Sequence, residues 1–359
     1  MRILNNPIYT QDIKYVANLS LPWERLRNKK ILISGASGMI GSFFIDVIMY
    51  RNEYFYENCL VIAVGRDEMK AQERFCSYWK SDCFTFLQQD INAPLSDMGD
   101  IDFVIHAASN THPVAYASDP IGTVTTNIIG TYNLLNYASE HNAERFLFAS
   151  SVEIYGENRG DIEKFDESYC GFIDCNTLRA GYPESKRAGE AICQAFIKQK
   201  GLNIVITRLS RIYGPTIQMS DTKAISQFIK KALSRENIIL KSGGTQLYSY
   251  NYIADAVSGM LTVLLKGECG EAYNISDDES NITLKDLAGT IAKYVETEVV
   301  FETPDKIEES GYSKATKALL DSRKLQNLGW KAKYSIQHGL IRTIDILSEV
   351  DSTEFLKGH

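Results

Sequence analysis

The sequence predicts an α/β protein: a doubly wound parallel sheet followed by a smaller α/β lobe at the C-terminal end. Through the first two thirds of the chain, short β-branched and aliphatic runs alternate with amphipathic helical patterns. Helices between successive strands require crossover connections, and therefore a parallel sheet with helices on both faces. After Gly214 and Pro215 the elements become shorter. The length of 359 residues corresponds to about two globular units.

The first part of the chain contains six predicted strands, at 30–34, 60–64, 84–88, 103–106, 146–150 and 204–208. One long helix is expected over 121–140, because Ile128, Leu134 and Ala138 recur at helical spacing. Residues 1–28 precede the first strand. We expect them to dock as an arm, since Leu21 and Trp23 would otherwise face water.

The remainder of the chain predicts a smaller lobe of mixed elements. Its helices are expected at 222–234, 254–266 and 284–295, and its strands at 238–240 and 272–275. No internal repeat or low-complexity segment interrupts this pattern.

Composition excludes several classes of protein. The chain carries 38 Lys and Arg against 45 Asp and Glu, a formal charge of −7, and no long basic block, so nucleic acid is not an expected partner. No stretch approaches the roughly 20 apolar residues of a membrane span. Seven cysteines without a CxxC pair and only five histidines indicate reduced thiols and no metal centre. We expect a cytoplasmic protein.

A glycine-rich loop follows the first predicted strand and precedes an apolar helix. Gly35, Gly38 and Gly41 recur as GxxGxxG. The first glycine suits a tight turn, the second a close approach of the backbone to a pyrophosphate, and the third close contact between helix and strand. This context predicts a dinucleotide site in a Rossmann-type fold. The expected cofactor-binding loop comprises Gly35, Ser37, Gly38, Met39, Ile40 and Gly41.

These patterns divide the chain into three parts. The expected parts are an N-terminal arm at 1–28, a dinucleotide-binding Rossmann domain at 29–215 and a mainly substrate-binding lobe at 216–359.

The end of the second strand bears on the choice between NAD and NADP. An acidic residue at this point usually binds the adenosine ribose hydroxyls, but here Gly65, Arg66 and Asp67 follow the strand. The Arg66 cation would suit a 2′-phosphate, which favours NADP. Alternatively Arg66 is a solvated side chain at a helix start that Asp67 caps. The sequence leaves both cofactors open.

A second set of residues suits hydride transfer. Ser151 and Glu153 follow the strand at 146–150, and Tyr182 and Lys186 lie four residues apart on one face of a predicted helix. An ammonium near a phenol lowers the phenol pKa, so that Tyr182 takes a hydroxyl proton as hydride leaves the same carbon. Ser151 would hold the substrate oxygen.

With these motifs the chain resembles the extended short-chain dehydrogenase/reductase family, the nucleotide-sugar epimerases and dehydratases, from about 29 to 347. The resemblance implies that Asp90 and Ile91 lie by the adenine and that Ala107 and Ala108 lie along the cofactor. Asn127 belongs to another shared motif and is expected at the cofactor. Ser151, Tyr182 and Lys186 would form the catalytic set. Such enzymes oxidise C4 of a nucleotide-linked hexose with NAD or NADP and often return the hydride.

Fewer residues distinguish the branches of this family. Glu153 stands where similar 4,6-dehydratases and UDP-glucuronate decarboxylases carry a glutamate, and it could remove the C5 proton of a 4-keto intermediate. Val152 replaces the aspartate that protonates the leaving hydroxyl in many dehydratases. The segment beginning at Arg179 looks most like the decarboxylases, but Tyr248 stands where those enzymes have an arginine. Arg211 could replace that cation, or it could pair with Asp255 or Glu153.

The smaller lobe supplies further expected substrate contacts, Gln227 and Asn251. Our hypothesis is therefore a nucleotide-sugar epimerase or dehydratase that forms a 4-keto intermediate, with a UDP-glucuronate decarboxylase-like enzyme as the alternative. A net NADPH-dependent reductase and a non-catalytic dinucleotide-binding protein also remain open. By resemblance we expect a homodimer that pairs the helices at 121–140 and 182–199.

Overall fold

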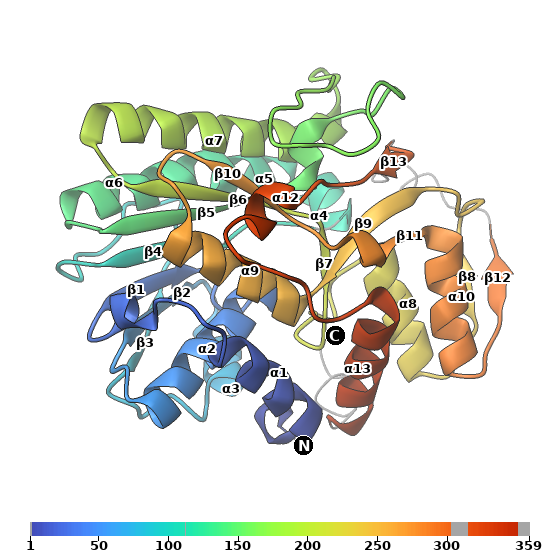
Figure 1. Cartoon of the computed structure of the whole chain (residues 1–359), viewed down its shortest axis with the longest axis horizontal. Helices are drawn as coiled ribbons and strands as arrows, with labels where there is room; N and C mark the ends of the chain where they lie inside the picture. The colour runs from blue at the N-terminus through green and yellow to red at the C-terminus, as the bar shows by residue number, and fades with distance from the viewer. Residues whose placement is uncertain (1, 112, 303–314, 351–359) are drawn as a thin grey trace.

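A computed structural model describes residues 2–111, 113–302 and 315–350 of the protein (Figure 1). A seven-stranded parallel sheet with the strand order β10-β6-β5-β4-β1-β2-β3 forms its centre. The predicted doubly wound sheet is thereby confirmed. Its strands are β1 (Lys30–Ser34), β2 (Leu60–Gly65), β3 (Phe84–Gln88), β4 (Phe103–His106), β5 (Arg145–Ser151), β6 (Ile204–Leu209) and β10 (Ala272–Ile275).

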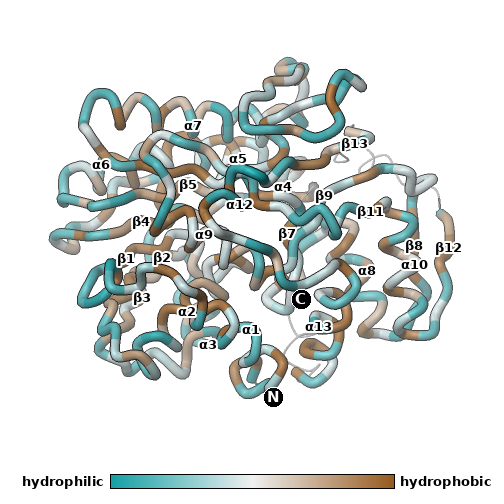
Figure 2. Tube along the Cα trace, in the orientation of Figure 1, coloured by the Kyte–Doolittle hydropathy of each residue, from teal (hydrophilic) through white to brown (hydrophobic). Residues whose placement is uncertain are grey.

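Alternate residues of these strands bury into two separate hydrophobic clusters, one on each face of the sheet. Ile31 and Ile33 of β1 point to one cluster and Leu32 to the other. On the first face lie α2 (Met39–Phe55) and α9 (Ile253–Lys266), and on the second α6 (Thr131–Glu140) and α7 (Gly181–Lys200). Figure 2 shows hydrophobic stretches along the central strands and hydrophilic stretches in the outer loops.

The helix expected over 121–140 forms with an irregularity in its middle. It consists of α5 (Pro120–Thr125), a π-helical turn at Thr126–Gly130 and then α6. A Cβ on Gly130 would lie 2.6 Å from Ile91 Cδ1, so a larger residue there would require the Ile91 side chain to move. Hydrophobic periodicity cannot reveal a single wide turn, because it shifts the pattern by only one residue.

The smaller lobe contains short strands and three helices of ten or more residues in the described ranges (Figure 1). The helices are α8 (Ala224–Leu233), α10 (Leu284–Tyr294) and α13 (Ile336–Glu349). The strands are β7 (Arg211–Tyr213), β8 (Ile238–Leu240), β9 (Leu247–Tyr252), β11 (Asn281–Thr283), β12 (Val299–Phe301) and β13 (Lys317–Ala318). Residues 303–314 and 351–359 of the expected lobe lie outside the described residues.

One expectation about the smaller lobe is wrong. The strand at 272–275 forms, but as β10 it lies beside β6 at the edge of the large sheet. The helix expected at 254–266 is α9, which packs against β5 and β6 of that same sheet. A hydrophobic run predicts a strand, but it does not say which sheet the strand joins. The chain therefore returns to the large sheet after residue 215.

The N-terminal arm is docked, as predicted. Its helix α1 (Pro7–Ala17) packs against α2, α9 and α13, and Trp23 is buried. Tyr9 of α1 donates a hydrogen bond to Asp46 of α2. Asp12 accepts hydrogen bonds from the Tyr252 hydroxyl at 2.6 Å and from Arg342 Nε at 2.9 Å. The arm therefore contacts both the large sheet's helices and the smaller lobe. No helix in the described ranges combines the length and apolar character needed to cross a bilayer.

Candidate active site

A cavity of about 1130 Å³ lies along the carboxyl ends of the large sheet's strands, and the smaller lobe closes its other side. Its wall begins with residues that directly follow β1, β2, β4, β5 and β6, and it continues through α8, β8 and β9. The carboxyl edge of an open parallel sheet is the usual ligand site of such folds.

The cavity gathers most of the expected site residues from distant parts of the sequence. Three of them, Asn127, Lys186 and Asn251, do not line it. Those that line it are Gly35, Ser37, Gly38, Met39, Ile40, Gly41, Arg66, Asp90, Ile91, Ala107, Ala108, Ser151, Glu153, Arg179, Tyr182, Arg211, Gln227 and Tyr248.

The glycine loop forms one end of the cavity. Gly35 has a φ of +69°, a backbone conformation that favours glycine. A Cβ at this position would also lie 2.7 Å from Ala108 Cα, so the turn after β1 approaches the residues after β4 too closely for a side chain. Gly38 caps α2 with no side-chain hydrogen bond, and the first turn contains no acidic residue. An uncapped helix N-terminus on a cavity wall fits a pyrophosphate.

The wall beyond β2 fits the adenosine end of a dinucleotide. Asp67 Oδ1 accepts a hydrogen bond from Lys70 N at 3.0 Å and so caps α3 (Glu68–Arg74), which confirms that part of the expectation. Within the described ranges no carboxylate forms an ion pair with Arg66, which lines the cavity. Asp90, on the same wall, accepts a hydrogen bond from Asn92 N at 2.9 Å. Asp67 therefore caps the helix, and the Arg66 cation on the cavity wall is still available to bind a ligand.

Ser151 and Tyr182 meet at the middle of the cavity. Ser151 ends β5, and its Oγ accepts a hydrogen bond from Glu153 N at 3.2 Å, starting a short 3₁₀ turn. Tyr182 lies in the first turn of α7 and is 7% exposed. Lys186, one turn further, is buried behind the wall, where its Nζ donates to Ala149 O at 2.8 Å.

The pKa of Tyr182 differs from the expectation. It is raised, because burial disfavours the phenolate and the Glu153 charge adds to that effect, whereas a hydrogen bond with Ser151 and the Arg179 charge lower it. Lys186 is not among the groups that shift it, so the predicted lowering of the Tyr182 pKa by Lys186 is wrong for this structure. Burial lowers the pKa of Lys186 itself to about 7.

Glu153 and Arg179 form an ion pair on the cavity wall. Arg179 Nη2 lies 2.7 Å from each carboxylate oxygen of Glu153. The Arg179 guanidinium also lies 4.8 Å from the ring centre of Tyr116, and the Tyr116 ring stacks on Tyr182 with centres 5.0 Å apart. Sequence reasoning missed Tyr116. Its position in the connection after β4, at the carboxyl edge of the sheet, was the available signal.

Asn127 belongs to a buried polar chain behind the cavity. Its Nδ2 donates to Ser185 Oγ at 2.9 Å, and its Oδ1 accepts from Ser109 Oγ at 2.8 Å. Ser185 in turn donates to Tyr182 O at 2.9 Å. The side chain is fully buried, forms hydrogen bonds with protein groups and does not line the cavity, so the expected direct contact with the cofactor is not supported.

Asn251 of β9 does not line the cavity, and its side chain is fully buried, whereas Tyr248 and Tyr250 of the same strand line it. Successive side chains of a strand alternate between its faces. The expected contact of Asn251 with the substrate stays a prediction. Gln227 of α8 lines the cavity, as expected.

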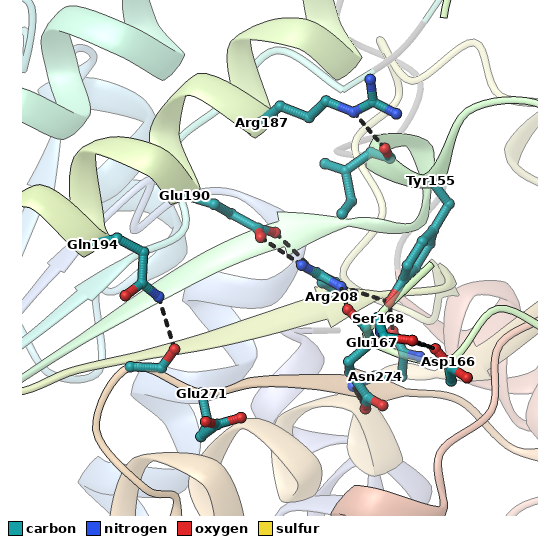
Figure 3. A network of polar contacts seen from close by, with 12 residues as sticks. Tyr155, Asp166, Glu167, Ser168, Arg187, Glu190, Gln194, Arg208, Glu271 and Asn274 are labelled. Atoms are coloured by element: carbon teal, nitrogen blue, oxygen red, sulfur yellow. Dashed lines mark hydrogen bonds and ion pairs between the residues drawn. The ribbon is translucent and has the colours of Figure 1, made fainter. Parts of the chain in front are cut away.

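The segment after Ser151 is held by a network of polar contacts (Figure 3), and the labelled residues of this network do not line the cavity. Tyr155 donates to Asn274 Oδ1 at 2.6 Å and accepts from Arg208 Nη1 at 3.0 Å. Arg208 also pairs with Glu190 at 2.8 Å. This network connects β5, β6, α7 and β10, and so it holds the elements that carry Ser151 and Tyr182. The described residues contain no cluster of three or more side chains suited to a metal ion.

Comparison with known proteins agrees with this geometry. Residues 31–276 match the model of the "NAD dependent epimerase/dehydratase family". The chain belongs to this family. UDP-glucuronic acid decarboxylase 3 of Arabidopsis thaliana is 31% identical over 319 residues, which cover 87% of each chain.

Solved structures of this epimerase/dehydratase family share the fold. The UDP-glucuronic acid 4-epimerase of Bacillus cereus, in complex with UDP-glucuronic acid and NAD, matches with a TM-score of 0.76 and 23% identity, over 89% of this chain and 99% of that one. A dTDP-glucose 4,6-dehydratase of Streptomyces venezuelae with bound NAD matches with a TM-score of 0.76 and 22% identity, over 90% and 98%. The resemblance to the extended short-chain dehydrogenase/reductase family is confirmed.

Proposed function

We propose that this protein uses NAD or NADP to oxidise C4 of a nucleotide-linked sugar and completes an epimerisation or elimination from the resulting 4-keto intermediate. The observation that carries the proposal is the meeting of Ser151, Tyr182 and Glu153 on one cavity wall, with the glycine loop on the same cavity. Family membership supports NAD as the cofactor. The loop residues 35–41 would hold its pyrophosphate, and Asp90 and Ile91 its adenosine end.

The chain's own residues supply the proton chemistry. When bound, NAD supplies a hydride acceptor. Ser151 Oγ is placed to hold the C4 oxygen, and Tyr182 Oη to take the hydroxyl proton. A buried phenolate needs positive charge nearby. The Arg179 charge favours the phenolate, although burial and the Glu153 charge outweigh it and raise the Tyr182 pKa; Lys186 lies one turn along the same helix.

The fate of the intermediate depends on Glu153 and its neighbours. Paired with Arg179, the Glu153 carboxylate faces the cavity as a candidate base for C5. Val152 also lines the cavity and offers no proton for a leaving hydroxyl, which weighs against a simple dehydratase. The decarboxylase alternative is favoured by the 31% identity with a UDP-glucuronic acid decarboxylase.

The test is mass analysis of products after incubation with UDP-glucose, UDP-glucuronate and UDP-N-acetylglucosamine and their dTDP, CDP and GDP counterparts, with NAD and NADP supplied. Loss of water identifies a dehydratase, loss of carbon dioxide a decarboxylase, and a new isobaric product an epimerase. Parallel incubations with NADH and NADPH test for a net reductase, which would consume one reduced cofactor for each carbonyl reduced. No conversion of any sugar would contradict the proposal.

Tyr182→Phe tests the catalytic role directly. Removing the phenol oxygen is expected to lower cofactor reduction by about 100-fold or more, because general base catalysis contributes roughly 10²–10⁴-fold. Binding of the nucleotide sugar should change by less than about twofold, since the ring remains in place. Cofactor reduction is followed by absorbance and binding by calorimetry. Full turnover by the variant would refute the assignment of Tyr182 as the base.

We propose that Arg66 gives the site a preference for NADP over NAD. Its cation lines the cavity directly after β2, and the last residue of that strand is Gly65 instead of the carboxylate that usually binds a ribose hydroxyl. Arg66→Ala is expected to lower the NADP-to-NAD affinity ratio by about tenfold, a typical value for one charge-assisted contact. Fluorescence titration with both reduced cofactors measures the ratio. An unchanged ratio would rule out this role.

We further propose that the protein is a cytoplasmic homodimer with a nucleotide-sugar substrate. Ile121, Ile129 and Tyr132 are 77%, 42% and 51% exposed along α5 to α6, beside α7. Apolar side chains grouped on one face favour burial against a second copy. All seven cysteines are free, which is usual in a reducing compartment.

A further inference from the structure

Arg211 is a cavity-lining cation that lies over an aromatic ring and, unlike Arg179, forms no ion pair with a described carboxylate. Its guanidinium carbon lies 3.5 Å from the ring centre of Tyr248, and both side chains line the cavity. In the described ranges no Asp or Glu lies within ion-pair distance of Arg211. Stacking occupies the face of a guanidinium and leaves its in-plane N–H donors available.

Three other cationic side chains that line the cavity form ion pairs with carboxylates. Their pairs are Arg179 with Glu153, Lys223 with Asp221 and Lys231 with Glu236. These carboxylates neutralise their own partners. Arg211 therefore brings a positive charge into the cavity that none of these carboxylates neutralises.

Tyr248 is a fixed support for this arginine. It is 4% exposed, and its hydroxyl donates to Ala315 O at 2.6 Å. The strand register puts Arg211 and Tyr248 near Ser151, because Ser151 of β5 lies opposite Leu209 of β6 and Arg211 follows two residues later. Arg211 itself pairs with Tyr250 of β9. Residues of two strands, β7 and β9, thus position the cation on the same cavity that Ser151 lines.

We propose that Arg211, oriented by Tyr248, binds an anionic oxygen group of the nucleotide sugar and thereby selects the substrate. The inference rests on the proposed function. A guanidinium binds two oxygens in one plane, and both a diphosphate and a sugar carboxylate present them. The diphosphate is common to all nucleoside diphosphate sugars, whereas the carboxylate would restrict the enzyme to acidic sugars.

The experiment compares Arg211→Gln with its parent by calorimetry, in a Tyr182→Phe background that prevents turnover. The three ligands share one nucleoside diphosphate, the one that the parent binds most tightly. They are its conjugate with glucuronate, its conjugate with glucose, and the free nucleoside diphosphate. Weakening of all three by about 10- to 100-fold indicates the diphosphate, and weakening of the glucuronate alone indicates the carboxylate. A change below about twofold for all three, or a parent that binds none, overturns the inference.

Two further variants separate orientation from charge. Tyr248→Phe keeps the ring and should change affinity by less than about twofold, whereas Tyr248→Leu removes the support and should weaken the same ligand by about three- to tenfold. Arg323→Gln removes an exposed charge outside the cavity and controls for net charge. If the parent protein, with Tyr182 intact, reduces the cofactor and Arg211→Gln leaves the affinity for all three ligands unchanged, only this inference fails. If no cofactor reduction occurs, the proposed function fails.

Discussion

Burial sets the charge of Lys186, a residue whose sequence position alone suggests a permanent cation. Its Nζ lies 4.9 Å from the ring centre of Phe148 and donates to Ala149 O. Because burial disfavours the ammonium more than the nearby Glu190 charge favours it, the pKa falls from 10.5 to about 7. The protonation of Lys186 therefore depends on the pH of the experiment.

This lowered pKa predicts a pH-dependent stability. A group whose folded pKa is depressed contributes stability that is present above its unfolded pKa, here 10.5, and lost as the pH falls through about 7. Relative to Lys186→Met, the free energy of unfolding of the parent should rise between pH 7 and 10 by up to about 1.4 kcal/mol per pH unit. Urea denaturation measures it, with the exposed Lys198→Met as the control. A constant difference would contradict the prediction.

The sequence predicted the residues that directly follow strands better than those that depend on side-chain direction. Ser151, Glu153 and Tyr182 meet because parallel strands and their helices bring their ends to one edge. Asn127, from a family motif, and Asn251, from the smaller lobe, are buried and do not line the cavity. A family motif marks a position in the chain, and the local wide turn or the strand face decides what that position contacts.

Among the elements, α1 is stabilised by polar anchors that its sequence does not reveal. Asp12 is fully buried and pairs with Arg342 of α13 while accepting the Tyr252 hydroxyl. Helical periodicity predicts that such a segment is amphipathic, but its partners come from the other end of the chain. The contact therefore had to be seen in the structure.

Asp12→Ala is expected to lower the free energy of unfolding by about 3 kcal/mol, because it leaves Arg342 unpaired and the Tyr252 hydroxyl without its acceptor. Lys164→Ala breaks the more exposed pair with Asp278 and should cost less than about 1 kcal/mol. Thermal or urea unfolding compares the two variants. Equal losses would mean that Asp12 does not anchor the arm.

At the scale of the whole molecule, the proposed dimer is testable through the exposed apolar face of α5 to α6. Sedimentation is expected to detect a dimer at micromolar concentration, and Tyr132→Glu should shift it towards monomer by burying a charge in the interface. Tyr54→Glu, at a 56% exposed tyrosine of α2 on the other face of the sheet, is the matched control. A monomeric parent protein would refute the dimer.

The fold class was predictable because βαβ alternation is a strong repeating pattern, and six strands of the large sheet formed at the expected places. The seventh strand was assigned to the wrong lobe. Its partner β6 is more than sixty residues earlier in the chain, at a sequence separation that no local pattern encodes. Strand existence is a local property, whereas sheet membership is a property of the complete fold.

That edge position of β10 has a consequence for how the protein is made. During translation, β6 leaves the ribosome well before Ala272–Ile275 does, so its outer backbone groups have no native partner until that strand arrives. An uncovered strand edge invites pairing with another nascent chain. The cofactor-side sheet can thus be completed only after much of the other lobe has been synthesised, and the two lobes must reach their native state together.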